Sequence, residues 1–244
     1  MRVDALAVRL RPRSYVEAAD LGVRLCQHVA RSVYASYLAV ALPVFVLCLA
    51  TFEVASWLPT FAMWMAKPWL DRTILFALSR AAFGQSTTVA DVWNAQREVW
   101  WSQLIRSWTQ RRLSPWRCLT APVYQLEGLR GEPQRRRVQQ VRSGKTGAGI
   151  LVTSAFGLVE LALVFSLLAL CVWFAPEGMR PSLDVIFGAE GGGEWRFVMA
   201  LAYAMTVALV EPFYVAAGFG LYLNRRVELE AWDIEQEFRR AQPE

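Results

Sequence analysis

The sequence predicts an all-α integral membrane bundle of about four transmembrane helices, with amphipathic interfacial helices beside them. Hydrophobic residues make up 55% of the chain and charged residues 19%, which is not typical of a soluble domain. Three apolar runs, at 34–52, 147–175 and 197–223, are long enough to cross about 30 Å of hydrocarbon. We therefore expect a single membrane domain over 1–244 that is built from helical hairpins.

The first part of the chain is expected to form an amphipathic helix and then a hairpin. Ser14 with Glu17 three residues later is a capping box, and small and apolar residues follow at helical spacing. Residues 1–32 are therefore assigned to a cytoplasmic or interfacial helix, and 33–84 to the first helical hairpin.

The second part is expected to repeat this order with an insertion. Residues 85–146 are assigned to a cytoplasmic segment, with an amphipathic helix that begins at a cap on Thr88 and a basic loop over 112–146. The second hairpin covers 147–223, and 224–244 form a charged helical tail in the cytoplasm or along the interface.

Lysine and arginine set the predicted orientation. The N-terminal segment, the 85–146 segment and the C-terminal tail all carry arginine, whereas 176–194 holds only Arg180. Cytoplasmic segments of membrane proteins are enriched in these residues. Four spans with both termini in the cytoplasm satisfy this rule.

A two-fold internal repeat is one interpretation of this layout. In each half, the returning span carries a charge followed by proline, Lys67-Pro68 in the first and Glu211-Pro212 in the second. Two helical hairpins can also look alike by composition, so both interpretations stay open.

The segment MAKPWLDR, at 65–72, places charge inside an apolar stretch. Counting from the cytoplasmic ends of their helices puts Lys67, Glu160 and Glu211 in one layer, roughly 20 Å from the inner face. Our hypothesis is an intramembrane charge cluster in which Lys67 bridges both glutamates, with Asp71 and Arg72 one turn nearer the cytoplasm.

Rows of small residues accompany these glutamates. The rows recur every four residues, as Ala200, Ala204, Ala208, Pro212, Ala216 and Gly220 on the last span and as Gly149, Thr153 and Gly157 on the third. Such rows allow membrane helices to approach closely.

Three interpretations of the charge cluster remain open. It is a buried ion pair that fixes helix packing, a proton or substrate site in a transporter-like bundle, or a lysine that reaches an interface from a tilted or broken span.

No catalytic residues, cofactor or metal site are expected. The segment SGKT at 143–146 lacks the glycine that a phosphate loop needs at position 139, where Gln139 stands. His28 is the only histidine, and the four cysteines form no CxxC pair. These features argue against an enzyme.

A basic, tryptophan-rich region is expected to contact lipid rather than nucleic acid. Beside membrane hairpins, arginine and tryptophan anchor the inner interface and meet anionic headgroups. The candidate contacts with headgroups or partners are Arg111, Arg112, Arg117, Arg135, Arg136 and Arg137.

Several segments resemble known bacterial membrane proteins. The tail LYLNRRVELEAWDIE is similar to the ending of multi-pass proteins related to the membrane domain found beside glycerophosphodiester phosphodiesterases, and the opening RPRSYVEAADLGVRL resembles their start. Their closing motif, Y-x-x-R-x-x-x-E-x-x-D, is matched loosely by Tyr222, Arg225 or Arg226, Glu228 or Glu230, and Asp233. KPWLDRTILFALSRAAFG and RLSPWRCLTAPVYQLEGLRG resemble uncharacterised proteobacterial membrane proteins from gene clusters of MoxR-type AAA ATPases with von Willebrand-type partners.

The resemblance implies a non-catalytic component of an envelope-associated system in the bacterial inner membrane. It transfers no catalytic residue, because the diesterase barrel is absent. We expect a scaffold or interaction protein whose partners are the bilayer and membrane or cytoplasmic proteins. The alternative is a small transporter or permease-like subunit that uses Lys67, Glu160 and Glu211.

Overall fold

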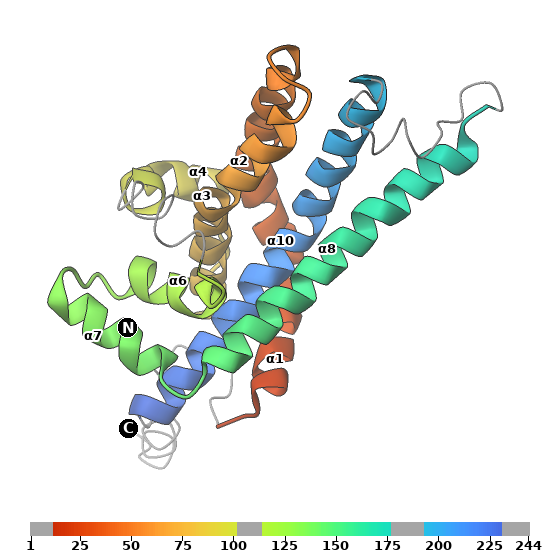
Figure 1. The fold of residues 1–244 in the computed structure, drawn as a ribbon. Helices are drawn as coiled ribbons and strands as arrows, with labels where there is room; N and C mark the ends of the chain where they lie inside the picture. The colour runs from red at the N-terminus through yellow and green to blue at the C-terminus, as the bar shows by residue number, and fades with distance from the viewer. Residues whose placement is uncertain (1–11, 102–113, 177–192, 231–244) are drawn as a thin grey trace. The chain divides into compact units, whose positions relative to one another are not determined.

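A computed structural model describes residues 12–101, 114–176 and 193–230 (Figure 1). Within these ranges the chain is helical and forms no strand, so the predicted all-α class is confirmed. The elements are α1 (Tyr15–His28), α2 (Ala30–Ala50), η2 (Thr51–Glu53), α3 (Leu58–Ala81), α4 (Val89–Asn94), η3 (Arg97–Trp101), α6 (Arg117–Leu126), α7 (Glu132–Arg142), α8 (Thr146–Phe174) and α10 (Gly193–Glu230).

Three helical segments of the described chain are long and apolar enough to cross a membrane. They are Ala30–Glu53, Thr146–Phe174 and Gly193–Glu230, and they indicate a helical membrane protein. Helix α3 is also 24 residues long, but it carries the charges of Lys67, Asp71, Arg72 and Arg80 and is not among the three.

The chain divides into two compact units. The larger unit contains Met1–Tyr37, Pro68–Ser154 and Pro212–Glu244, and the smaller unit contains Leu38–Lys67 and Ala155–Glu211. Each unit therefore draws on both predicted hairpins.

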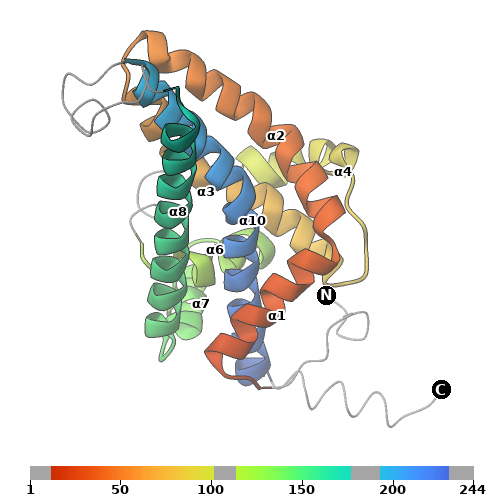
Figure 2. The same cartoon turned by 90° about the vertical axis from the view of Figure 1, so that its right-hand side faces the viewer.

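In the larger unit, α1 and the second half of α10 meet through small residues (Figure 2). The two helix backbones are in close contact. A Cβ added to Gly22 would lie 2.0 Å from the carbonyl oxygen of Ala216, and a Cβ added to Gly220 would lie 2.2 Å from the carbonyl oxygen of Ala18. The Ala216 and Gly220 positions of the predicted small-residue row thus lie in a helix contact. In contrast, a Cβ on Gly157 would meet nothing within 4 Å.

Side chains at the helix ends fix the course of the chain in this unit. Ser14 Oγ accepts a hydrogen bond of 3.3 Å from the Glu17 N–H at the start of α1. The side chain of Asn224 binds the backbone of Arg13, accepting from its N–H at 2.8 Å and donating to its carbonyl at 3.0 Å. The ends of α1 and α10 are therefore joined directly.

The capping box at Thr88 is confirmed at the start of α4. The Asp91 N–H donates to Thr88 Oγ1 at 3.3 Å, and the Thr88 N–H donates to Asp91 Oδ2 at 2.9 Å. The tryptophan-rich helix predicted after this cap is split, because α4 ends at Asn94 and η3 is a π-helix. The residues that follow η3, 102–113, lie outside the described residues.

Three indole rings gather where η3 meets α3 in the larger unit. The Trp100 ring centroid lies 5.5 Å from that of Trp69 and 5.9 Å from that of Trp93. Trp100 is buried and its Nε1–H donates to Thr73 Oγ1 at 3.1 Å. This hydrogen bond satisfies the polar atom of the buried indole.

Helices α6 and α7 replace the basic loop that the sequence predicts over 112–146. Pro133 lies in the first turn of α7, where a missing N–H costs no hydrogen bond. Pro122 lies inside α6 and cannot donate to the carbonyl of Cys118. Gly218 of α10 lies close to the Cys118 carbonyl, since a Cβ added to Gly218 would be 2.5 Å from the Cys118 carbonyl oxygen. The loop prediction over 117–126 and 132–142 was wrong, because both segments are helical with Pro122 and Pro133 inside them.

Aromatic and polar contacts join α10 to the segment between α2 and α3 in the smaller unit. The rings of Phe52 and Phe197 pack edge to face with centroids 5.4 Å apart. Arg196 Nη1 donates to Ser56 Oγ at 2.7 Å. These contacts tie the first turns of α10 to the end of the α2 segment.

Candidate functional site

The smaller unit contains a buried cluster of one lysine and two glutamates. Lys67 of α3 contacts the carboxylate of Glu160 on α8, and its Nζ lies 2.7 Å from Glu211 Oε2 on α10. The Lys67 side chain is 8% exposed and that of Glu211 is 0% exposed. The structure therefore brings together the three residues that the sequence places in one layer.

This cluster has more acidic than basic groups. A lysine ammonium offers three N–H donors, enough to reach both carboxylates. With all three groups ionised, the formal charge of the cluster is negative. Removing one partner of a buried pair is costly because the other charge stays desolvated. The arrangement can hold three helices together, and a second carboxylate could also bind a proton or a cation.

Asp71 and Arg72 are the other two members of the predicted charge cluster. Both belong to the larger unit, where Arg117 Nη2 of α6 lies 3.1 Å from Asp71 Oδ2. The Arg117 guanidinium also lies over the Tyr214 ring, 5.5 Å from its centroid. Asp71 thus has a cation partner on α6, and the predicted grouping of Asp71 and Arg72 with Lys67 stays a prediction.

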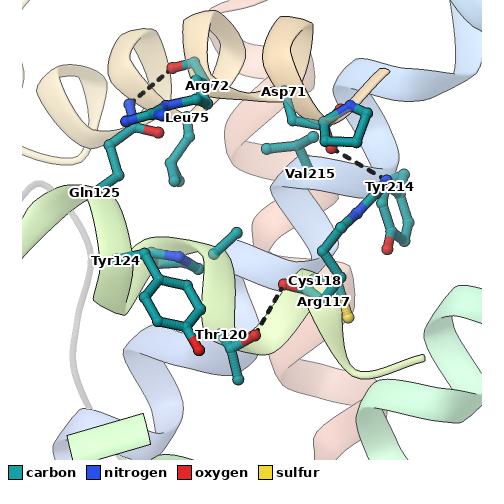
Figure 3. Close-up of a pocket in the computed structure, with 13 residues that line it drawn as sticks. Asp71, Arg72, Leu75, Arg117, Cys118, Thr120, Tyr124, Gln125, Tyr214 and Val215 are labelled. Atoms are coloured by element: carbon teal, nitrogen blue, oxygen red, sulfur yellow. Dashed lines mark hydrogen bonds and ion pairs between the residues drawn. The ribbon is translucent and has the colours of Figure 1, made fainter. Parts of the chain in front are cut away.

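A pocket that is partly open to the outside lies beside this pair. Figure 3 shows Asp71 and Arg117 on one side of it and Arg72 with Gln125 on the other. Gln125 Nε2 donates to the carbonyl oxygen of Arg72 at 2.8 Å. The lining residues come from α3, α6 and α10, and they are Pro68, Asp71, Arg72, Leu75, Arg117, Cys118, Thr120, Ala121, Pro122, Tyr124, Gln125, Tyr214 and Val215.

Cys118 supplies a buried thiol to the lining of this pocket. Burial raises the pKa of Cys118 above its ordinary value, so the thiol stays protonated at neutral pH. Its Sγ donates to the carbonyl of Gly149 at 3.5 Å, and the Thr153 hydroxyl donates to Sγ at 3.7 Å. Cys118 thus serves the contact between α6 and α8.

A second charge network joins α7 to the end of α10 in the larger unit. Arg137 Nε donates to Glu127 Oε2 at 2.9 Å, and the same guanidinium pairs with Glu230. Tyr222 donates its hydroxyl to Glu127 Oε1 at 2.9 Å, and Arg226 pairs with Glu230. Burial lowers the pKa of Arg137, but hydrogen bonds to both glutamates outweigh it and raise the pKa above its ordinary value.

The arginines predicted to contact lipid headgroups fall into three groups. Arg111 and Arg112 lie outside the described residues. The two engaged within the protein are Arg117 and Arg137. Arg135 and Arg136 are exposed on α7, where Arg136 Nε lies 3.2 Å from Glu132 Oε1.

Sequence reasoning missed Tyr124, Gln125 and Tyr214 as pocket residues. The first two lie on α6, for which the sequence predicts a loop, so the helix face that they share could not be recognised. A helical reading of 117–126 would have placed Arg117, Ala121 and Gln125 four residues apart along one face.

In the described part of the chain, no group of three or more His, Cys, Asp or Glu side chains could hold a metal ion. No protein-family model matches the sequence, and neither a curated protein nor a solved structure matches it.

Proposed function

We propose that this chain is a non-catalytic scaffold or interaction protein of an envelope-associated system in the bacterial inner membrane. The observation that supports this best is the way α7 is held. Its inner side is fixed by ion pairs to the chain around it, while two arginines on its outer side remain exposed. An ordered basic helix of this kind suits an acidic surface on a partner protein.

Several contacts hold α7 against α10. Besides the pairing of Arg137 with Glu230, Arg225 Nη2 donates to the carbonyls of Gln140 at 3.2 Å and Ser143 at 2.9 Å. Lys145 Nζ, just beyond α7, lies 2.8 Å from Glu228 Oε1. Contacts at both the middle and the end of α7 fix its orientation within the larger unit.

The opposite face of α7 carries the proposed interaction surface. Its exposed residues are Glu132, Pro133, Arg135, Arg136, Gln139 and Gln140. Two arginines against one glutamate give this surface a net positive formal charge. We will call it the α7 surface.

The proposal includes four spans, with α3 as the fourth, and both termini in the cytoplasm. The 24 residues of α3 extend roughly 36 Å at the rise of an ideal helix, more than the hydrocarbon thickness. Its buried lysine has carboxylate partners, as intramembrane charges require. A two-fold repeat is supported by the occurrence of Pro68 and Pro212 inside helices, each directly after one member of the Lys67–Glu211 pair.

Site-specific photocrosslinking tests the scaffold function. A benzophenone amino acid is placed at Arg135 or Gln139 in the cells that make this protein. We expect a discrete protein adduct at both positions, and mass spectrometry identifies the adduct. As a control, the same probe at Leu158, an exposed apolar residue of α8, should mark lipid instead.

Charge reversal makes this test specific to the α7 surface. Arg136→Glu should remove most of the adduct at Gln139. Arg24→Glu, at an exposed arginine of α1, should leave the adduct unchanged. If neither α7 position yields a protein adduct, the scaffold proposal is wrong.

A small transporter or permease-like subunit is the second candidate. It is favoured by the excess carboxylate beside Lys67 and by the full burial of Glu211. Exchanging the two residues, as Lys67→Glu with Glu211→Lys, keeps the pair and discriminates the candidates. A scaffold should keep its crosslinks and its cellular phenotype. A transport site that needs a carboxylate at one place should lose the phenotype even though the protein is stable.

A further inference from the structure

We propose that one exposed face of α4 and η3 lies in the interfacial layer of the bilayer, with its indole rings among the lipid headgroups. The face consists of four residues at intervals of four, Val89, Trp93, Arg97 and Trp101, and we will call it the α4–η3 face. All four residues are exposed, Trp93 at 62% and Trp101 at 67%. The proposal goes beyond the scaffold function, because this face includes none of the residues of the α7 surface.

The other side of the same segment is packed within the larger unit. Val92 and Trp100 are buried. At the start of α4, Asp91 Oδ2 lies 3.8 Å from Arg80 Nη2 of α3, and at η3 the Trp100 indole donates to Thr73 of the same helix. Contacts with α3 therefore hold the segment at both ends, so the α4–η3 face is a fixed feature of this unit.

The composition of the α4–η3 face suits a membrane interface better than water. Tryptophan is enriched at this interface because its ring is apolar and its N–H is polar. A helical segment that combines such rings with a basic residue lies roughly 5–10 Å into the boundary between headgroups and acyl chains. The α7 surface, in contrast, carries polar and charged residues with one proline and no aromatic side chain.

The start of α4 lies beside a helix that is suited to cross the membrane. Ser32 belongs to the first turn of Ala30–Glu53, which is long and apolar enough for a span. Ser32 Oγ donates to the Thr87 carbonyl at 2.7 Å and accepts from the Thr87 N–H at 3.0 Å. The first turn of a spanning helix lies near a bilayer surface, so the chain enters α4 at that level. This continuity favours lipid over a partner protein as the occupant of the α4–η3 face.

Arg97 provides the charge of the α4–η3 face. It is exposed and stands four residues from each of the two indoles. An arginine can lay its apolar stem along such rings while its guanidinium reaches the polar layer. The planar guanidinium also matches the oxygens of a phosphate group. A lipid phosphate is therefore the ligand that we assign to Arg97.

Spin labelling of the full chain in phospholipid nanodiscs, with one chain per disc, tests the proposal. A nitroxide is attached through a ketone-bearing amino acid at position 93 or 101, in place of the tryptophan. Its collisions with oxygen, which concentrates in lipid, and with a water-soluble nickel chelate are then measured. The control for water is Gln139 of the α7 surface, and the control for lipid is Leu158 of α8.

We expect a loss of most nickel collisions at both positions relative to Gln139, with oxygen collisions as frequent as at Leu158. Nickel collisions as frequent as at Gln139 would overturn the proposal, because the α4–η3 face would then lie in water. Few collisions with either reagent would also overturn it, since protein would then cover the face. Val89 takes the place of Trp93 if that variant does not fold.

A matched pair of charge reversals tests the phosphate contact. Arg97→Glu should raise the nickel collisions of a nitroxide at position 101, because a carboxylate is repelled by the lipid phosphates. Arg24→Glu makes the same change at an exposed arginine of α1 and should leave these collisions unchanged. Equal effects of the two reversals would contradict the assignment of a lipid phosphate to Arg97.

Discussion

The carbonyl oxygen of Ala216 occupies the space that a side chain on Gly22 would need, since an added Cβ would lie 2.0 Å from it. The same holds in the other direction across this helix contact, because a Cβ added to Gly220 of α10 would lie 2.2 Å from the carbonyl oxygen of Ala18 on α1. In the larger unit, α1 and α10 therefore pack backbone against backbone. Neither contact has a flexible side chain that could move aside.

Gly22→Ala should destabilise the protein. The new methyl group forces α1 away from α10, and overpacking of this kind costs about 2 kcal/mol. Chemical denaturation in detergent measures the change in the free energy of unfolding. Gly157→Ala is the matched control, because a Cβ there meets nothing within 4 Å. It should be neutral or stabilising by about 0.5 kcal/mol. Equal destabilisation by both variants would contradict the close contact.

Lys67→Ala and Glu211→Ala should show strong coupling in a double-mutant cycle. Lys67→Ala leaves two carboxylates without their cation, which costs about 3 kcal/mol or more, whereas Glu211→Ala leaves Lys67 its contact with Glu160. The double variant removes the Glu211 carboxylate together with its cation, so we expect a coupling energy of about 2 kcal/mol. The readout is the free energy of unfolding of the detergent-solubilised protein.

An exposed pair supplies the reference for this cycle. Arg136 and Glu132 of α7 also form an ion pair, but their side chains are 76% and 62% exposed. Their cycle should give about 0.4 kcal/mol. A Lys67–Glu211 coupling no larger than this reference would mean that the buried contact does not stabilise the fold.

Arg137→Ala should loosen α7, whereas Arg136→Ala should not. Arg137 joins α7 to Glu127 and Glu230, so its loss leaves two partly buried carboxylates without this cation, at a cost of about 3 kcal/mol. Hydrogen–deuterium exchange of 132–142 should become faster in this variant only. Identical exchange in the two variants would show that α7 is held by other contacts.

The cap at the start of α4 should weaken in acid. Hydrogen bonds from the backbone and side chain of Thr88, with Arg80 nearby, hold the pKa of Asp91 below its ordinary value. A carboxyl with a lowered pKa contributes stability above its unfolded pKa and loses it as the pH falls through its folded pKa.

Asp91→Asn isolates this effect. At neutral pH, amide exchange around Thr88 should be faster in the variant than in the wild type, since the ionised acceptor is lost. In strong acid the two proteins should exchange alike in this region. A difference that persists unchanged in acid would show that the charge of Asp91 has no part in the cap.

The contacts that the sequence anticipates depend on regular helix geometry. A fixed rise per residue allows Lys67, Glu160 and Glu211 to be placed at one depth by counting alone. A capping box is local, so Thr88 with Asp91 predicts the start of α4 without tertiary information. These arguments need no knowledge of which helix lies beside which.

The pocket could not be anticipated in this way. The pocket depends on a helical chain around Pro122. Pro122 has no N–H to donate to the Cys118 carbonyl, and Gly218 approaches that carbonyl closely. Only tertiary packing decides between a loop and a helix at such a position. The pairing of Arg117 with Asp71 follows from this helix, and the sequence analysis could not anticipate it.

The tryptophan cluster gives the larger unit an optical signature of its own. The Trp100 ring centroid lies less than 6 Å from those of Trp69 and Trp93, so the electronic transitions of these rings are coupled and absorb circularly polarised light unequally. This near-ultraviolet signal reports the packing of η3 on α3, whereas the far-ultraviolet signal reports helix content. Loss of the first with retention of the second would reveal an unlocked state without any added label.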